Sequence, residues 1–267
     1  MNLLSSTSVF GFYTLLSRVL GYFRDILIAI FLGTSIYADA FFVAFRLPNT
    51  FRRLFAEGTF NAAFIPSYAE EKLKGEETGK KFADEVFNLL LFFLILLVLV
   101  VEIFTPFLVY LIAPGFYDDP EKFSLATEFT RITFPFLLFV SLSSLLSGVL
   151  NTNNKFAAAA AAPIALNIVL ILSMLVSFYF NQNFARNLSI GVTLAGMLQL
   201  IILFIFTRKF YFPSIRLSLK IRESLKNFFK KLLPSIFSSG ITQINILIGT
   251  IIASFQSGAV SYLYYAD

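Results

Sequence analysis

The sequence contains no cysteine, no histidine and no tryptophan among its 267 residues. Without cysteine there is no disulfide and no thiol chemistry, and without histidine the commonest general base and metal ligand is missing. No group of acidic residues has metal-ligand spacing, and no glycine-rich phosphate loop of the P-loop kind is present. We therefore expect no catalytic residue, no metal site and no cofactor, and no direct ATP hydrolysis.

Charged residues are also scarce, at 14% of the chain, whereas 57% of the residues are hydrophobic and the mean hydropathy is +0.79. This composition is typical of a multi-span membrane protein and not of a soluble domain. The N-terminus lacks a short apolar core with a small-residue cleavage site, so no signal peptide is predicted. The net charge is +5, and the basic residues cluster in loops beside the expected spans. This distribution indicates membrane topology and not a nucleic-acid partner.

Apolar runs and helix breakers predict an all-α integral membrane protein, a polytopic helical bundle. Six spans are expected over about 8–33, 36–66, 84–113, 123–151, 156–180 and 187–207, with a solvated loop at 67–81. A seventh span is expected over 232–256 and the start of an eighth from Ala259. The chain then stops without a terminating loop, which suggests the N-terminal part of a longer protein.

The segment 208–231 is basic and amphipathic, and it divides the predicted units 1–207 and 232–267. It is either a solvated connector on the membrane surface or a segment with a regulatory or lipid-headgroup role. Lysine and arginine concentrate in the loops after the second and sixth expected spans. The positive-inside rule therefore predicts that these loops and the N-terminus are cytoplasmic.

Three charges interrupt the first expected span, within the stretch Ser17-Arg18-Val19-Leu20-Gly21-Tyr22-Phe23-Arg24-Asp25. A charge at the bilayer centre costs from about 2.5 to more than 10 kcal/mol. On a helical wheel the polar and small residues of this stretch share one arc of about 140°, opposite an apolar face. This polar face either binds an anionic ligand or contains a buried Arg–Asp pair whose only role is to hold the bundle together.

Positive charges outnumber negative charges inside the expected spans. A cation exporter would show the reverse balance, whereas the planar guanidinium fork suits phosphate oxygens. Several arginines around an apolar-backed cavity would suit a pyrophosphate with a lipid tail. The positive residues are Arg18, Arg24, Arg46, Arg52, Arg53 and Arg131, and the negative ones are Asp25, Asp39, Glu57 and Glu102.

The second expected span contains Pro48, which predicts a kink or break, and a broken charged span is typical of a transport site. Arg53 and Glu57 lie four residues apart and could simply satisfy each other, and Arg46 could extend to the membrane surface. Asp39 has three open interpretations: a pair with an arginine, a proton or cation site, or a position in headgroup water.

Short motifs are spread along the whole chain and are densest over residues 17–66. Together they resemble the MurJ (MviN) family of lipid II flippases, of the multidrug/oligosaccharidyl-lipid/polysaccharide exporter superfamily. The motifs are Ser17-Arg18-Val19-Leu20-Gly21, Arg24-Asp25, Asp39-Ala40-Phe41-Phe42-Val43-Ala44-Phe45, Leu47-Pro48-Asn49, Arg52-Arg53, Phe55-Ala56-Glu57-Gly58, Ala113-Pro114-Gly115-Phe116, Thr133-Phe134-Pro135, Leu150-Asn151-Thr152, Pro163 with Asn167, and Tyr264-Tyr265-Ala266-Asp267.

The resemblance implies a MurJ/MATE-like fold with two six-helix lobes, of which this chain would cover the first and the opening of the second. It implies a transporter and not an enzyme, moving lipid II from the inner to the outer leaflet of the cytoplasmic membrane by alternating access. Sodium or the membrane potential would supply the energy, with any sodium site outside this chain. The expected partners are lipid II and membrane lipids, and no nucleic acid is expected. The protein would be a monomer.

The same resemblance implies roles for individual residues. Arg18, Arg24 and Arg52 match cavity arginines that would hold the pyrophosphate, and Asp39 and Glu57 match acids of the family. Ser17, Asp25 and Asn49 complete the predicted substrate site, and Gly21, Pro48 and Pro163 are predicted hinge or kink positions.

Two other function classes stay open at this point. One is a polysaccharide-lipid flippase or a cation-coupled multidrug exporter of the same fold. The other is a non-transporting membrane scaffold, for which charge-removing substitutions inside the spans would be tolerated.

Overall fold

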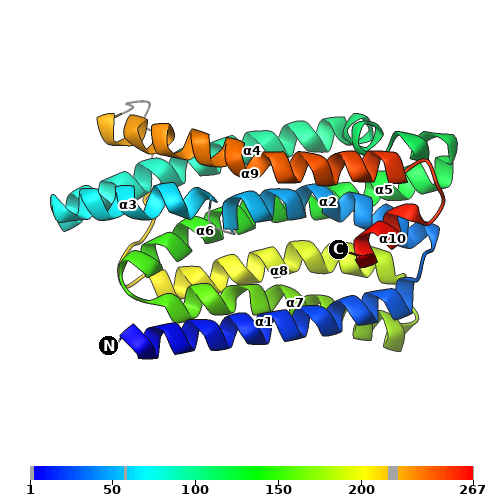
Figure 1. Ribbon diagram of the computed structural model, residues 1–267, viewed down its shortest axis with the longest axis horizontal. Coiled ribbons are helices and arrows are strands. Elements are labelled where there is room, and N and C mark those ends of the chain that lie inside the picture. The colour runs from blue at the N-terminus through cyan, green and yellow to red at the C-terminus, as the bar shows by residue number, and fades with distance from the viewer. Residues whose placement is uncertain (1–2, 57–58, 216–221, 267) are drawn as a thin grey trace.

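The computed structural model describes residues 3–56, 59–215 and 222–266, and these residues form helices joined by short turns, with no strand among them (Figure 1). The predicted all-α class is confirmed. The helices are α1 (Leu3–Leu32), α2 (Ile36–Ala56), α3 (Thr59–Leu73), α4 (Glu76–Ile112), the short 3-10 helix η1 (Pro114–Asp118), α5 (Pro120–Thr133), α6 (Phe136–Thr152), α7 (Phe156–Phe180), α8 (Phe184–Thr207), α9 (Glu223–Ala253) and α10 (Ala259–Ala266).

Four segments of the described chain are long and apolar enough to cross a membrane, which makes this a multi-pass membrane protein. They are Glu76–Ile112, Pro120–Thr152, Phe156–Phe180 and Phe184–Thr207. The first helix, α1, has 30 residues, or about 45 Å of helix, so its length also matches a crossing. It is not in the apolar set, and three charged residues, Arg18, Arg24 and Asp25, lie within this helix.

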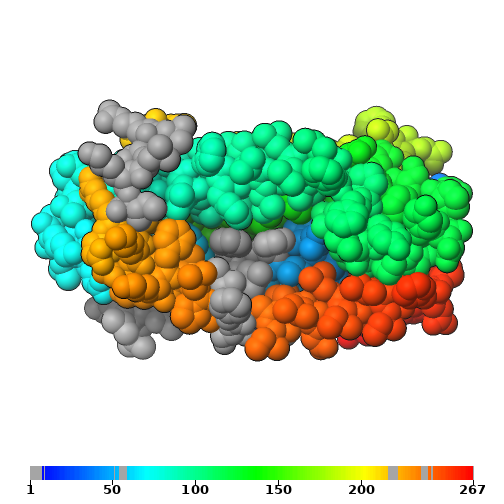
Figure 2. All heavy atoms as spheres, turned by 90° about the horizontal axis from the view of Figure 1, so that it is seen from above, coloured from blue at the N-terminus to red at the C-terminus, as the bar shows by residue number. Residues whose placement is uncertain are grey.

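The helices lie side by side along the long axis of the molecule (Figure 1). α1 packs on α7, α7 on α8, and α8 on α6, while α3 and α4 pack on α9 at the other side. The central element is α2, which contacts α5 and α6 and whose residues 38–47 are all buried. Seen from above, α4 and α9 lie on one face, and atoms of α2 are visible between them (Figure 2).

The second expected span, 36–66, is divided between two helices. α2 continues through Pro48, so the helix is not broken there. The predicted kink stays a prediction, and the helix is described as far as Ala56. α3 begins at Thr59 and ends at Leu73, so the prediction of a loop over 67–81 is wrong. The turn between α3 and α4 is only Lys74-Gly75, where Gly75 has a φ of 142°, which favours glycine.

The charged residues around this turn favour helix, which explains the error. Lys74 pairs with Glu71 at 2.5 Å, and Lys72 pairs with Glu76 at 3.3 Å. Glutamate and lysine are good helix formers, and Lys80 pairs with Glu77 within α4 at 3.3 Å, as in a solvated helix. The other two pairs lie at the turn between α3 and α4. The charge run therefore marks the exposed end of α3 and the start of α4, and not an unstructured loop.

The fourth expected span, 123–151, is likewise two helices. The turn Phe134-Pro135 separates α5 from α6, because proline lacks the N–H that would continue the helical hydrogen bonds. A related distortion occurs in α4, where the backbone of Phe104 leaves helical geometry two residues before Pro106. The fifth span matches α7 at both ends, and the sixth matches α8 closely.

The basic segment 208–231 is not a separate connector throughout, because α9 already begins at Glu223. Its first part is anchored to α4: the Tyr211 hydroxyl and the Ser214 N–H donate to Asp84 Oδ1 at 2.8 and 2.9 Å. Burial and the neighbouring Asp84 carboxylate raise the pKa of Tyr211, so its phenol stays protonated and keeps donating. Arg222 adds an ion pair to Glu85 at 2.8 Å.

The close approach of η1 to the end of α9 gives a stability prediction. A Cβ added at Gly115 would lie 2.5 Å from the Ser254 carbonyl oxygen and 2.6 Å from Phe255 Cα, both backbone atoms. Gly115→Ala should therefore lower the free energy of unfolding by about 1–3 kcal/mol, as overpacking does. Thermal unfolding of the purified protein in detergent measures this.

Gly11→Ala is the matched control, because nothing lies within 4 Å of a Cβ added there. Alanine is the better helix former, so the control should melt at or slightly above the wild-type temperature. Equal melting of the two variants would contradict the close contact between η1 and α9.

Candidate functional site

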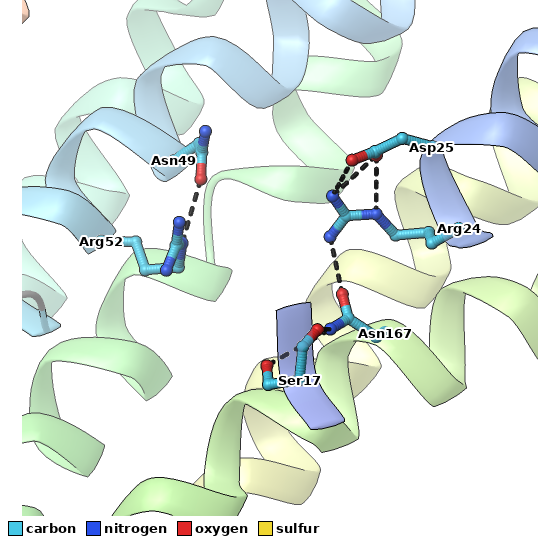
Figure 3. A network of polar contacts seen from close by, with 6 residues as sticks. All are labelled: Ser17, Arg24, Asp25, Asn49, Arg52 and Asn167. Atoms are coloured by element: carbon cyan, nitrogen blue, oxygen red, sulfur yellow. Dashed lines mark hydrogen bonds and ion pairs between the residues drawn. The ribbon is translucent and has the colours of Figure 1, made fainter. Parts of the chain in front are cut away.

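The Arg24 side chain lies at the centre of the polar network in Figure 3. Its Nε and Nη2 atoms donate to both carboxylate oxygens of Asp25, at 2.7–2.9 Å, and its Nη1 atom donates to Asn167 Oδ1 at 2.8 Å. The Arg24 side chain is 14% exposed and that of Asp25 is 42% exposed. The guanidinium is thus held in place on two sides, while its carboxylate partner remains open to solvent.

Asn167 connects α7 to the small face of α1. Its Nδ2 atom donates to the Ser17 carbonyl oxygen at 2.8 Å and lies 3.5 Å from Ser17 Oγ (Figure 3). A Cβ at Gly21 would lie 3.6 Å from Asn167 Nδ2, an ordinary van der Waals distance. The small residues of α1 therefore admit Asn167 without requiring glycine, and the predicted hinge role of Gly21 stays a prediction.

Asn167 belongs to the sequence motif with Pro163, and it was not among the predicted site residues. The available signal was an amide inside an otherwise apolar expected span, since polar residues in membrane helices commonly bond across to a neighbouring helix. What the sequence could not show is which helix Asn167 faces.

A second arm of the site comes from α2, where Arg52 Nε donates to Asn49 Oδ1 at 3.0 Å. Figure 3 shows Arg52 and Arg24 extending from α2 and α1 toward the same space. Tyr264 of α10 lies within electrostatic range of both arginines and of Arg46 on α2. Three helices thus place a tyrosine and three guanidinium groups around one region.

Some predicted site residues lie apart from this network. Arg18 is exposed on α1, and no described residue forms an ion pair with it. Glu57 lies outside the described residues, and so does the predicted Arg53–Glu57 pair. Pro48 and Pro163 lie inside the continuous helices α2 and α7.

Asp39 lies in a different cluster, fully buried where α2, α5 and α10 meet. It accepts from Lys122 Nζ at 2.6 Å, the Gly258 N–H at 2.9 Å, the Ser261 N–H at 2.9 Å and the Ser261 hydroxyl at 2.5 Å. Lys122 also lies 4.3 Å above the ring of Phe116. The carboxylate therefore caps the first turn of α10 from another helix.

This geometry corrects two interpretations of Asp39. Its ion-pair partner is a lysine and not an arginine, and it is buried and not in headgroup water. The sequence could not reveal the partner, because 83 residues separate the two charges. The role of Asp39 in substrate binding stays a prediction.

Removing the Asp39 carboxylate should destabilise the protein strongly. Asp39→Ala leaves Lys122 charged, buried and unpaired, which costs about 3–5 kcal/mol. The double variant Asp39→Ala with Lys122→Met should recover part of that loss, because no unpaired charge remains. Chemical or thermal unfolding in detergent measures both, with Glu121→Ala, an exposed acid beside Lys122, as the control. If Asp39→Ala unfolded like the control, the buried pair would not hold these helices together.

The fold and these two clusters define a polytopic α-helical membrane protein with a cationic site backed by apolar helices. The chain matches the model of the family "Lipid II flippase MurJ" over residues 28–267 and therefore belongs to that family. It is 43% identical over 275 residues to the probable lipid II flippase MurJ of Rhizobium meliloti (strain 1021), an alignment covering 100% of this chain and 51% of the relative. The chain spans about half the length of the curated relatives it matches.

Solved structures give the same fold. A structure described as lipid II flippase MurJ in an inward-closed conformation matches with a TM-score of 0.81 and 31% identity, covering 96% of this chain and 53% of that one. A multidrug/oligosaccharidyl-lipid/polysaccharide exporter superfamily transporter from Pyrococcus furiosus matches with a TM-score of 0.63 and 15% identity, covering 97% of this chain and 64% of that one. The second likeness concerns the fold alone.

Proposed function

We propose that this chain forms the substrate-holding first lobe of a lipid II flippase, a transporter and not an enzyme. It would move the undecaprenyl-pyrophosphate-linked peptidoglycan precursor from the inner to the outer leaflet of the cytoplasmic membrane by alternating access. Family membership supports the substrate. The observation that carries the proposal is the Arg24 guanidinium, held by Asp25 and Asn167 and directed toward the space that Arg52 shares.

The ion pair between Arg24 and Asp25 suits a site that binds and then releases an anionic ligand. A diphosphate diester carries two negative charges, whereas Asp25 carries one and is partly exposed. A bound pyrophosphate can therefore displace Asp25 from the guanidinium, and charge-assisted bonds to phosphate oxygens replace those to the carboxylate. Asn167 would keep the guanidinium in position during this exchange.

Alternating access requires one end of the bundle to open while the other closes. The Asp39 cluster joins α10, at the start of the expected second lobe, to α2 and α5 at one end. We propose that this end faces the outside, because the positive-inside rule puts the N-terminus and the basic segment after α8 in the cytoplasm. Energy coupling to sodium or to the membrane potential, and a monomeric state, belong to the same proposal.

The experiment uses cells depleted of their own lipid II flippase. The chain is expressed fused to the C-terminal half of the Rhizobium meliloti relative, since it spans about half of the relatives' length. The fraction of lipid II accessible at the outer face is then measured. Arg24→Ala should lower transport at least about tenfold, because it removes charge-assisted hydrogen bonds worth roughly 1.5–3 kcal/mol. Arg24→Lys should be intermediate, since lysine keeps the charge but loses the fork.

Arg208→Ala is the matched control, because Arg208 is an exposed arginine at the C-terminal end of α8, away from the site. It should transport like the unsubstituted fusion. Full transport by Arg24→Ala would refute the site assignment and leave the function standing. No transport by the unsubstituted fusion, with normal amounts in the membrane, would count against the function itself.

A further inference from the structure

A second charged pocket lies outside the Arg24 site, between α5, the distorted part of α4 and the first turn of α8. Its volume is about 560 Å³, within the usual range for a ligand pocket. One face of α5 forms its wall, because the residues follow each other at helical spacing. The polar wall residues are Ser124, Thr127, Glu128 and Arg131. Phe123 and Ile132 of the same helix, Pro106 of α4 and Arg186 of α8 also line the pocket.

The charges of this pocket favour an anion. Arg186 Nε pairs with Glu128 Oε1 at 3.0 Å and joins α8 to α5 at the rim. Arg131 is exposed, and no ion pair links it to another described residue; Glu102 of α4 lies within its electrostatic range. Glu128 already pairs with Arg186, so the groups available to an anion are the exposed Arg131 guanidinium and the exposed Ser124 hydroxyl on the same helix face.

The helices around the pocket indicate that such an anion would be a lipid headgroup. α5 is the polar part of a segment that crosses the membrane, with Glu121, Lys122, Glu128 and Arg131 within its 14 residues. Such a helix belongs at headgroup depth, because charges in the hydrocarbon core are costly. Beside Pro106, α4 exposes Phe107 and Ile103, which are 61% and 70% exposed and suit contact with acyl chains.

We propose that this pocket binds the phosphate of an anionic phospholipid headgroup, with the Arg131 guanidinium as its main ligand and Ser124 and Arg186 as further donors. Arginine suits this task because its fork binds two phosphate oxygens together. The site is separate from the Arg24 network and does not depend on the transport of lipid II.

The test measures binding of dihexanoyl phosphatidylglycerol to the purified protein in detergent by titration calorimetry. Dihexanoyl phosphatidylcholine and inorganic phosphate are titrated in parallel. Phosphatidylglycerol should bind more tightly than phosphatidylcholine, and Arg131→Ala should weaken it about tenfold, since a charge-assisted hydrogen bond is lost. Lys81→Ala, which removes an exposed cation near the start of α4, outside the basic segment 208–231, should leave the affinity unchanged.

Glu128→Gln is a second variant with the opposite expectation. It removes the repelling carboxylate and releases Arg186 from its ion pair, so phosphatidylglycerol affinity should rise. The proposal is overturned if Arg131→Ala binds like Lys81→Ala, as a role limited to compensating Glu102 predicts, or if Glu128→Gln binds more weakly. Equal binding of the two lipids also overturns it. Arg131-dependent binding of inorganic phosphate as tight as that of phosphatidylglycerol would overturn the lipid as the source.

Discussion

The constraint on which this structure depends is that a charge inside an apolar bundle must find a partner. An ionised group removed from water without compensation costs far more than any single packing contact contributes. The helices of this protein are apolar enough to lie in a bilayer, yet α1, α2 and α5 carry arginines, aspartates and a buried lysine. The ion pair Asp39–Lys122 joins α2 to α5, and Glu128–Arg186 joins α5 to α8.

The two best-defined ion pairs, Asp39–Lys122 and Arg24–Asp25, compensate their charges in different ways. Asp39 is fully buried, and four donors from α5 and the start of α10 surround it, so it acts as a fixed joint between helices. Arg24 and Asp25 are neighbours in one helix, and the carboxylate is partly exposed. A pair within one helix adds nothing to the assembly of different helices, but its partner can be exchanged for an external anion. We therefore assign structure to the first pair and ligand binding to the second.

The features predicted correctly, a helix boundary and the polar face of a helix, depend on residues that are close together in the sequence. The 156–180 span coincides with α7 because a largely apolar run of this length, bounded by polar turns, forms a helix in a membrane. The helical wheel placed Ser17, Arg24 and Asp25 on the face where the network forms. The pairing of Asp39 with Lys122 and of Arg24 with Asn167 could not be predicted, because each joins residues far apart in the chain. The last turns of α3, residues 67–73, were predicted as a loop for another reason: a run of Glu and Lys indicates exposure to solvent, which a loop and a charged helix share.

The central claim is that the Arg24 guanidinium exchanges Asp25 for a pyrophosphate. The most direct measurement is the affinity of the purified protein for undecaprenyl pyrophosphate, compared between the wild type and Arg24→Ala. The account predicts that the substitution weakens binding at least about tenfold, the loss expected for charge-assisted hydrogen bonds to phosphate oxygens. Equal affinities, with both proteins folded, would contradict it and would leave Arg24 and Asp25 as a pair that only satisfies itself.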